Sequence, residues 1–234
     1  LGNYHRAGAF RTPNIISDPT GQLTKLQKAV ARDFANRSWV RKRCEDAMNN
    51  TRRFLDAVNT AELYHDQVTC WLFGTAGPCH VLLTAGLRNP TVRRRYLETR
   101  KLLGDYGHME LHETLLEMQG SANLTRRRVE FHLAALTRAF DFARTIIQTP
   151  YRFASDISDV WIVATYSRCL AILHNDAHQD IQLEYAEGFH ELLEDLGITS
   201  FSDLQHRSEQ TKKSLPMVWK VADATMTSNP AVTD

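Results

Sequence analysis

The stretch from Trp71 to Tyr106, WLFGTAGPCHVLLTAGLRNPTVRRRYLETRKLLGDY, decides how the chain divides into helices. Its apolar residues recur with helical spacing, and two interruptions separate them. The first is Gly74 to Gly77 with Pro78, which predicts a hinge between two helices, since a phosphate-binding P-loop would need a preceding strand and a lysine. The second is Asn89 with Pro90, which predicts the start of a helix, because asparagine caps helices and proline fits the first helical position.

The helical period extends from Gln22 to the end of the chain. We therefore expect an all-α fold, a bundle of about ten amphipathic helices. The predicted helices begin near Gln22, Val40, Thr60, Cys79, Pro90, His108, Thr125, Val160, Ile181, Phe201 and Met217. The wide apolar arc of the helix after Thr125 predicts contacts on two sides.

One segment predicts a strand. Asn14-Ile15-Ile16 has the pattern of a strand end, and Asp18-Pro19-Thr20-Gly21 has the pattern of a type I turn. No partner strand is predicted elsewhere. We therefore expect residues 1–21 to be the remnant of a sheet that lies outside this sequence, and residues 22–234 to form a helical domain.

The totals exclude several classes of protein. Lys and Arg number 28 against 27 acidic residues, so a net charge of +1 gives no general attraction to nucleic acid or to a membrane. The four cysteines form no CxxC pair, which argues against zinc and for reduced thiols. No uninterrupted apolar run reaches the roughly 20 residues that span a bilayer. We expect a cytoplasmic protein without a membrane partner.

Several segments resemble one known family. They are IISDPTGQLTKLQ, HDQVTCWLF, AGLRNPTVRRRY, HETLLEMQGS, FASDIS, WIVATYSRC and LLEDLGITSFSDLQ. They are similar to the helical half of polymerase-β-type nucleotidyltransferases, especially the kanamycin-nucleotidyltransferase-like group, in which the catalytic sheet runs through a D-P-x-G turn into a helical domain. The resemblance implies that this chain is the helical, substrate-facing part of such a protein, with a catalytic domain before Leu1.

The resemblance also implies a reaction. The family transfers a nucleoside monophosphate from a nucleoside triphosphate to a small-molecule hydroxyl, and paired aspartates after a Gly-Ser step hold Mg²⁺. In this chain no D-x-D follows Gly120-Ser121, so no catalytic residue is carried over. We expect the chain alone to be inactive and to bind no cofactor itself. Its status as an enzyme stays open, as does whether a family loop is missing between Ser158 and Trp161.

Arginines around the Asn-Pro step form the first candidate site. Successive helical residues lie about 100° apart, so Arg93, Arg94 and Arg95 cannot all face one ligand. Arg94 falls in line with Glu98 on a solvated face and is excluded. Arg88, Arg93 and Arg95 remain candidates for binding an anion near a helix N-terminus. Structural ion pairs are the alternative.

Arg168 and Tyr166 are further candidates for contact with substrate. Arg168 is a permanent charge within an apolar segment, and a buried guanidinium needs a carboxylate or a ligand as partner. The candidate carboxylates are Asp66, Glu113 and Asp156. A structural ion pair is again the alternative.

Two histidine patterns suggest other functions. Arg127 and His132 match the R-x4-H spacing of HEPN-type ribonucleases, although Arg128 replaces the polar residue expected after the arginine. A HEPN-like RNA-binding or RNase module is therefore the alternative function, and a structural bundle that forms a homodimer is a third. His108 and His112 have a metal-ligand spacing, but the sequence identifies no third ligand, so we predict no metal site.

Overall fold

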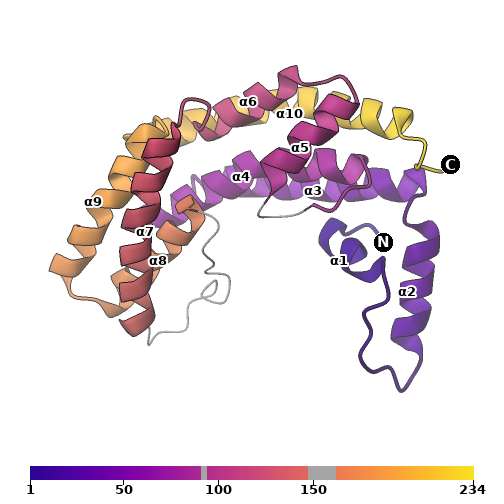
Figure 1. Cartoon of the computed structure of the whole chain (residues 1–234), viewed down its shortest axis with the longest axis horizontal. Helices are drawn as coiled ribbons and strands as arrows, with labels where there is room; N and C mark the ends of the chain where they lie inside the picture. The colour runs from indigo at the N-terminus through magenta and orange to yellow at the C-terminus, as the bar shows by residue number, and fades with distance from the viewer. Residues whose placement is uncertain (91–93, 147–161) are drawn as a thin grey trace. The chain divides into compact units, whose positions relative to one another are not determined.

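The structure, a computed structural model, describes residues 1–90, 94–146 and 162–234, except for the side chains of residues 162–165, 167 and 168. Over these ranges the fold is all-α, as predicted, and it contains one isolated β-bridge and no strand (Figure 1). The helices described are α1 (Tyr4–Phe10), α2 (Gln22–Asp33), α3 (Arg37–Ala57), α4 (Tyr64–Ala85), α5 (Arg95–Asp105), α6 (Glu110–Gln119), α7 (Arg126–Ile146), α8 (Ile162–Asp176), α9 (Gln179–Asp195) and α10 (Phe201–Ser228).

The chain divides into two compact units. Unit 1 comprises Leu1–Arg53, Ala76–Leu115 and Lys212–Asp234, and unit 2 comprises Phe54–Thr75 and Leu116–Thr211. Helices α3, α4, α6 and α10 each contribute residues to both units. The predicted boundary after residue 21 separates a sheet remnant from a helical domain, whereas this division separates two compact parts of the helical chain. The boundary after residue 21 stays a prediction.

The first residues of the chain differ from the prediction. Tyr4–Phe10 forms helix α1, and the side chain of Asn3 caps it by accepting a hydrogen bond from the N–H of Arg6 at 2.9 Å. Residues 14–16, the predicted strand, lie in irregular structure, and the side chain of Ile16 is fully exposed. The predicted strand was wrong because two isoleucines supply β-propensity but no partner, and a lone strand leaves its backbone groups unpaired.

The turn that follows has the predicted chemistry. The N–H of Gly21 donates to the carbonyl oxygen of Asp18 at 3.1 Å, which closes the turn. The carboxylate of Asp18 accepts a hydrogen bond from the N–H of Thr24 at 2.8 Å. This carboxylate therefore satisfies one of the free N–H groups in the first turn of α2, which begins at Gln22 as expected.

Helix α4 runs without interruption through Gly74, Gly77 and Pro78, so the predicted hinge is wrong. The two glycines instead allow close packing against α3. A Cβ atom at Gly77 would lie 2.0 Å from Oγ1 of Thr51, and one at Gly74 would lie 2.5 Å from Cδ2 of Leu55. Burial of α4 by packing of this kind offsets the hydrogen bond that Pro78 removes from the helix.

Helix α4 is also long and apolar enough, by length and composition, to cross a membrane, and no other helix of the described residues is. Its most apolar window has a mean hydropathy of 1.3, and 89% of that window is buried. The core helix of a globular protein passes the same test. The finding is therefore weak evidence for a membrane span.

Helix α5 begins at Arg95 rather than at Pro90, so the predicted cap is wrong. Asn89 and Pro90 lie in irregular structure, residues 91–93 lie outside the described residues, and Arg94 occupies the N-cap position. An Asn-Pro step does not distinguish a cap from a loop, because proline also pushes the preceding residue toward extended backbone.

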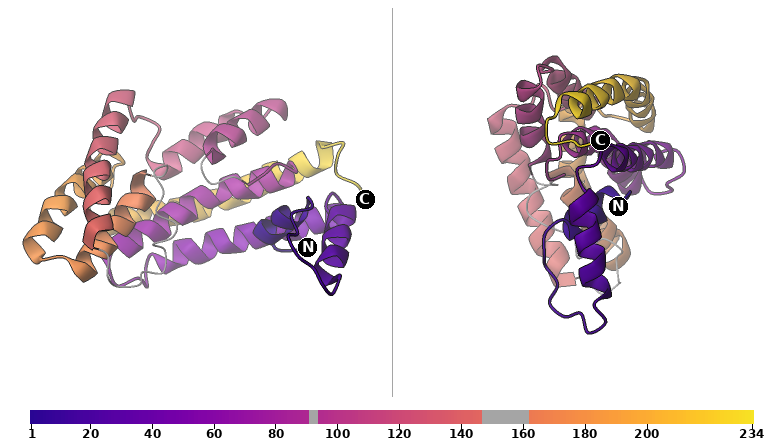
Figure 2. Two further views of the ribbon diagram at one scale, coloured as in Figure 1. Left: turned by 60° about the horizontal axis from the view of Figure 1, so that its bottom comes forward. Right: turned by 90° about the vertical axis from the view of Figure 1, so that its right-hand side faces the viewer.

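Unit 2 is built around α7, α8 and α9, which lie side by side in the two figures (Figures 1 and 2). Helix α7 packs against both α8 and α9, as its wide apolar arc predicted. The apolar core of the unit includes Trp71, Leu136, Ala139, Phe189, Leu193 and Leu204.

Helix α10 passes through Pro216, where two separate helices were predicted. Its buried residues recur at intervals of four and three along the whole length: Leu204, Ser208, Thr211, Leu215, Val218, Ala222 and Thr225. Pro216 lies between them on the exposed face. Water can therefore bond to the carbonyl group that loses its donor there, so the proline is tolerated.

Candidate functional site

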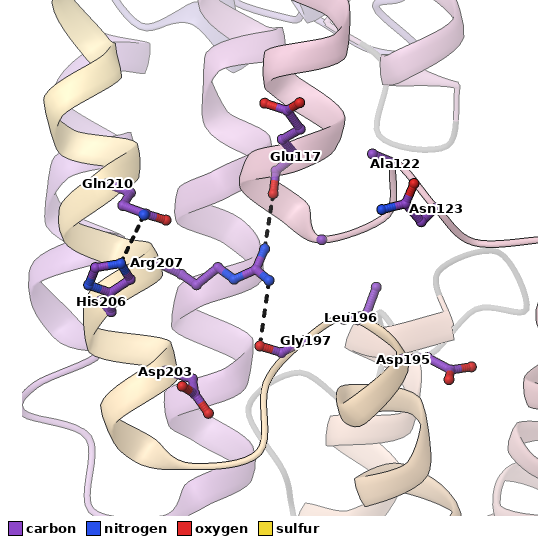
Figure 3. Close-up of a pocket in the computed structure, with 11 residues that line it drawn as sticks. Glu117, Ala122, Asn123, Asp195, Leu196, Gly197, Asp203, His206, Arg207 and Gln210 are labelled. Carbon is purple, nitrogen blue, oxygen red and sulfur yellow. Dashed lines mark hydrogen bonds between the residues drawn. The ribbon is translucent and has the colours of Figure 1, made fainter.

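A pocket of about 570 Å³ lies in unit 2, beside the C-terminal ends of α6 and α9 and the first turns of α10 (Figure 3). Its volume falls within the range of small-molecule sites. The lining residues are Glu117, Gly120, Ala122, Asn123, Asp195, Leu196, Gly197, Asp203, His206, Arg207 and Gln210.

Glycines end both helices beside the pocket. Gly120 follows α6 with φ of +75°, and Gly197 follows α9 with φ of +73°, a left-handed conformation that favours glycine. A Cβ atom at Gly120 would lie 2.1 Å from the carbonyl oxygen of Leu196. Glycine at this position therefore lets the ends of α6 and α9 meet and form one wall of the pocket.

Arg207 of α10 connects these two helix ends. Its Nη1 donates to the carbonyl oxygen of Glu117 at 3.0 Å, and its Nη2 donates to that of Gly197 at 3.5 Å (Figure 3). The helix dipole stabilises a cation at the C-terminal end of a helix, and Arg207 lies at the C-terminal ends of both α6 and α9. This contact holds the wall of the pocket together and uses two of the five N–H donors of the guanidinium.

Asp203 lies in the first turn of α10, the helix that was predicted to begin near Phe201. Its carboxylate accepts hydrogen bonds from the N–H and hydroxyl of Thr199 and from the hydroxyl of Ser200, each at 2.9 Å. The backbone N–H of Thr199 is the largest cause that lowers the pKa of Asp203 to about 2. Asp203 is therefore ionised at neutral pH.

Asp195 is the last residue of α9, where the helix dipole disfavours a carboxylate, and the cation Arg128 offsets this. Its Oδ2 accepts a hydrogen bond from Nε of Arg128 at 2.5 Å and lies 2.7 Å from Nε2 of His132. Arg128 also donates to Glu191 at 2.8 Å. The hydrogen bond from Arg128 is the main cause that lowers the pKa of Asp195. This network ties α7 to α9.

The pocket carries more acidic than basic groups. Glu117, Asp195 and Asp203 are its carboxylates, and Arg207 is the one permanent cation among its lining residues. The carbonyl ends of α6 and α9 add negative potential. His206, whose Nε2 lies 2.8 Å from Nε2 of Gln210, lies at the exposed edge. Such a lining favours a ligand rich in hydrogen-bond donors over a phosphate group.

The arginines predicted to bind an anion lie in unit 1, in different environments. Arg88 forms an ion pair with Asp105. Arg94 pairs with Glu98 at 3.2 Å and its side chain is 62% exposed, as predicted for a solvated face. Arg93 lies outside the described residues. Arg95 is only 2% exposed, so it lies on the buried face of α5.

Burial lowers the pKa of Arg95, because an apolar surrounding disfavours the charged guanidinium, and the thiol of Cys79 partly opposes this. Arg88 pairs near the surface while Arg95 is enclosed. The structure therefore does not bring these two arginines to a common surface.

The second pair of candidates belongs to α8. Tyr166 is buried, and its hydroxyl donates to the carbonyl oxygen of Tyr185 at 3.0 Å. A Cβ atom at Gly188 would lie 2.6 Å from that hydroxyl oxygen. Tyr166 therefore joins α8 to α9. The side chain of Arg168 lies outside the described residues.

Arg127 and His132, the HEPN-like pair, lie on different faces of α7. Arg127 is exposed, whereas the side chain of His132 is 1% exposed and contacts Asp195. Arg128, which interrupted the motif, is the arginine that shares Asp195 with His132. The structure thus brings together His132 and Arg128 rather than the predicted pair.

The other histidine pair lies at the start of α6. Nδ1 of His108 is 3.7 Å from Glu110, and Nδ1 of His112 is 3.9 Å from Glu113. Over the described ranges no group of three histidine, cysteine or acidic side chains has metal-binding geometry. The predicted absence of a third ligand is not tested further by this structure.

Sequence reasoning missed the residues that shape the pocket. Glu117, Asp195 and Arg207 stand on amphipathic helices, where charged residues normally face solvent. One signal was present. Asp195 follows Glu194 at the end of a helix, just before Gly197, and acidic residues there oppose the helix dipole.

No family model, no curated protein and no solved structure matches the chain. The resemblance of its segments to nucleotidyltransferases therefore stays a prediction.

Proposed function

We propose that this chain is the helical, substrate-facing part of a nucleotidyltransferase-like protein, and that the pocket in unit 2 holds the acceptor substrate. One observation carries the proposal. Two of the segments that carry the resemblance, residues 112–121 and 192–205, are far apart in the sequence, yet both line this pocket. The full protein would transfer a nucleoside monophosphate from a nucleoside triphosphate, with Mg²⁺, to a small-molecule hydroxyl.

The lining of the pocket supports an acceptor with hydroxyl and ammonium groups. Asp195 and Asp203 stay ionised at neutral pH because hydrogen bonds lower the pKa of each. Arg207, the cation, already donates to two backbone carbonyl groups. A polyphosphate would meet a pocket lined by Glu117, Asp203 and the Arg128-paired Asp195, so the proposal assigns the triphosphate and Mg²⁺ to another part of the protein.

A transfer assay tests the proposal that this chain binds the acceptor substrate but does not itself catalyse nucleotidyl transfer. The purified chain is incubated with radiolabelled nucleoside triphosphate, Mg²⁺ and a panel of small hydroxylated acceptors. We expect no labelled product, because no Gly-Ser step followed by D-x-D is present to hold the metal. Robust transfer by this chain would overturn the proposal that it is only the helical part.

A binding assay tests the pocket. Amino sugars and the matching neutral sugars are compared by NMR titration, and we expect the amino sugars to bind more tightly. Ala122 lies in the exposed connection between α6 and α7 and lines the pocket, so Ala122→Phe should fill it and abolish binding. Ala134 is exposed on α7 and does not line the pocket, so Ala134→Phe is the matched control. Equal binding by both variants would exclude this pocket as the site.

A further inference from the structure

Three aromatic rings meet where α1 packs within unit 1. The hydroxyl oxygen of Tyr4 lies 3.2 Å from Nδ1 of His80 in α4. The ring of His5 lies 3.9 Å from that of Tyr4 and 5.6 Å from that of His80, measured between centroids. The backbone N–H of Tyr4 donates to Asp46 of α3 at 3.1 Å. These contacts attach α1 to two helices of its own unit.

The side chain of His80 is buried, and its surroundings favour the neutral ring. It is 6% exposed, and its Nε2 has no hydrogen-bond partner among the described residues. If the Tyr4 hydroxyl donates to Nδ1, the proton of the neutral ring must be on Nε2. Protonation of the ring would then place a full charge in a buried position that offers Nε2 no acceptor.

The surrounding charges oppose that protonation. Burial is the largest cause that holds the pKa of His80 well below its ordinary value, followed by repulsion from Arg95 and His5. Burial also lowers the pKa of His5, and Asp46 partly opposes this. Besides the rings themselves, the charged groups that act on them are Asp46 and Arg53 on α3 and Arg95 on α5.

We propose that α1 is a pH-sensitive latch, which neutral His80 holds against α3 and α4 and which protonation of His80 releases in mildly acidic solution. With α1 in place, burial and the nearby Arg95 and His5 disfavour protonation of the ring. With α1 released the ring meets water and takes a proton with an ordinary histidine pKa of about 6.5. The inference is independent of the function proposed for unit 2.

The direction of the pH dependence follows from these two states. The latched state has the depressed pKa, so latching is fully present above about pH 6.5 and is lost as the pH falls below that value. For one histidine, the ratio of released to latched molecules rises by about thirtyfold between pH 7.5 and pH 5. Any contribution from His5 adds to this change, because burial lowers its pKa in the same direction.

Release exposes a basic and polar face. Arg95 is buried within unit 1, and the hydroxyl of Tyr96 has no hydrogen-bond partner among the described residues. Arg95 interacts electrostatically with Tyr4 and His80, and Tyr96 interacts with Arg95. The latch would therefore control access of solvent to this cluster.

Hydrogen exchange tests the latch. Amide exchange of residues 4–10 is measured by mass spectrometry at pH 7.5 and pH 5 and corrected for intrinsic rates, with residues 40–51 of α3 as the reference within the same unit. We expect protection of α1 to fall by about thirtyfold at pH 5 while that of α3 is retained. Unchanged protection of α1 would overturn the proposal.

Two variants assign the effect. His80→Asn places a non-titrating amide near the position of Nδ1, so the pH dependence of α1 protection should fall to the part that His5 contributes; the same loss as in the wild type would overturn the proposal. Tyr4→Phe keeps His80 and removes only the hydroxyl, so protection at pH 7.5 should fall several-fold. If His80→Asn does not fold, wild-type protection in Tyr4→Phe would still refute a latch held by this hydrogen bond.

Discussion

Gly77 lies against Thr51 at a separation that leaves no room for a side chain. The sequence places Thr51 and Leu55 four residues apart, on one face of their helix, and both are buried. It did not predict that Gly74 and Gly77 are their partners, because the sequence pattern of a glycine is the same at a helix break and at a close helix–helix contact. What distinguishes the two cases is the helix that packs against the glycine, and a local sequence pattern gives no information about that helix.

Gly77→Ala should destabilise the protein by about 1 to 3 kcal/mol, because the new methyl group would overlap Oγ1 of Thr51. Urea unfolding followed by circular dichroism measures the change. Gly8→Ala is the control, since no atom lies within 4 Å of a Cβ at Gly8, which is also helical, and it should be neutral or slightly stabilising. Equal stability of the two variants would contradict the close approach of α3 and α4.

Asp203 should contribute to stability in a defined pH window. Its pKa is lowered to about 2, so its stabilising hydrogen bonds are fully present above the ordinary aspartate pKa of about 4 and are lost as the pH falls toward 2. Asp203→Asn should therefore lower stability at pH 7 and reduce the dependence of stability on pH between 4 and 2. Urea unfolding of both proteins across this window measures the difference, and parallel pH profiles would contradict it.

The helices themselves were predicted more accurately than their ends. About ten were expected and ten are described, but the agreement partly reflects errors that offset each other. Helix α1 was not predicted, and two pairs of predicted helices form the continuous α4 and α10. Pro78 and Pro216 misled the prediction because a proline signal is local, whereas burial along the whole helix decides whether it continues.

Pro216→Ala distinguishes a continuous α10 from two separate helices. Proline in a helix interior is about 3 kcal/mol less favourable than alanine, and Pro216 is exposed, so the replacement leaves no cavity. We expect stabilisation by about 1 to 3 kcal/mol, reduced by the greater freedom of the unfolded chain. If Pro216 instead began a helix, alanine would be neutral or destabilising. Thermal unfolding measures the sign.

The pocket could not be predicted at this level, because it depends on how helix ends meet. Gly120 and Gly197 follow α6 and α9, and both have positive φ as helix-ending glycines do. Nothing in their local sequence indicated that Arg207 would bind both ends. The contact with Glu117 joins residues 90 positions apart, so only the folded structure reveals it.

The charge of the whole molecule bears on the alternative function of RNA binding. The net charge is +1, and the run of arginines at the start of α7 is largely neutralised within unit 2. Arg126 pairs with Glu130 at 2.7 Å, and Arg128 pairs with Glu191 and Asp195. Arg127 is exposed, which leaves a single arginine of this run facing solvent without an ion pair among the described residues. One such charge provides little electrostatic attraction for a phosphate backbone.

We therefore expect single-stranded RNA to bind more weakly than about 10⁻⁴ M at physiological salt, the weak limit of non-specific binding, when measured by fluorescence anisotropy. Arg127→Ala should leave this affinity almost unchanged. The double variant Glu130→Gln/Glu191→Gln releases Arg126 and part of the pairing of Arg128, so it should bind more tightly and with a steeper salt dependence. Metal-independent cleavage that Arg127→Ala abolishes would favour the HEPN-like function over the acceptor pocket, because it requires an arginine-dependent RNA site on α7. Micromolar binding by the wild type would contradict the weak affinity expected from the paired arginines.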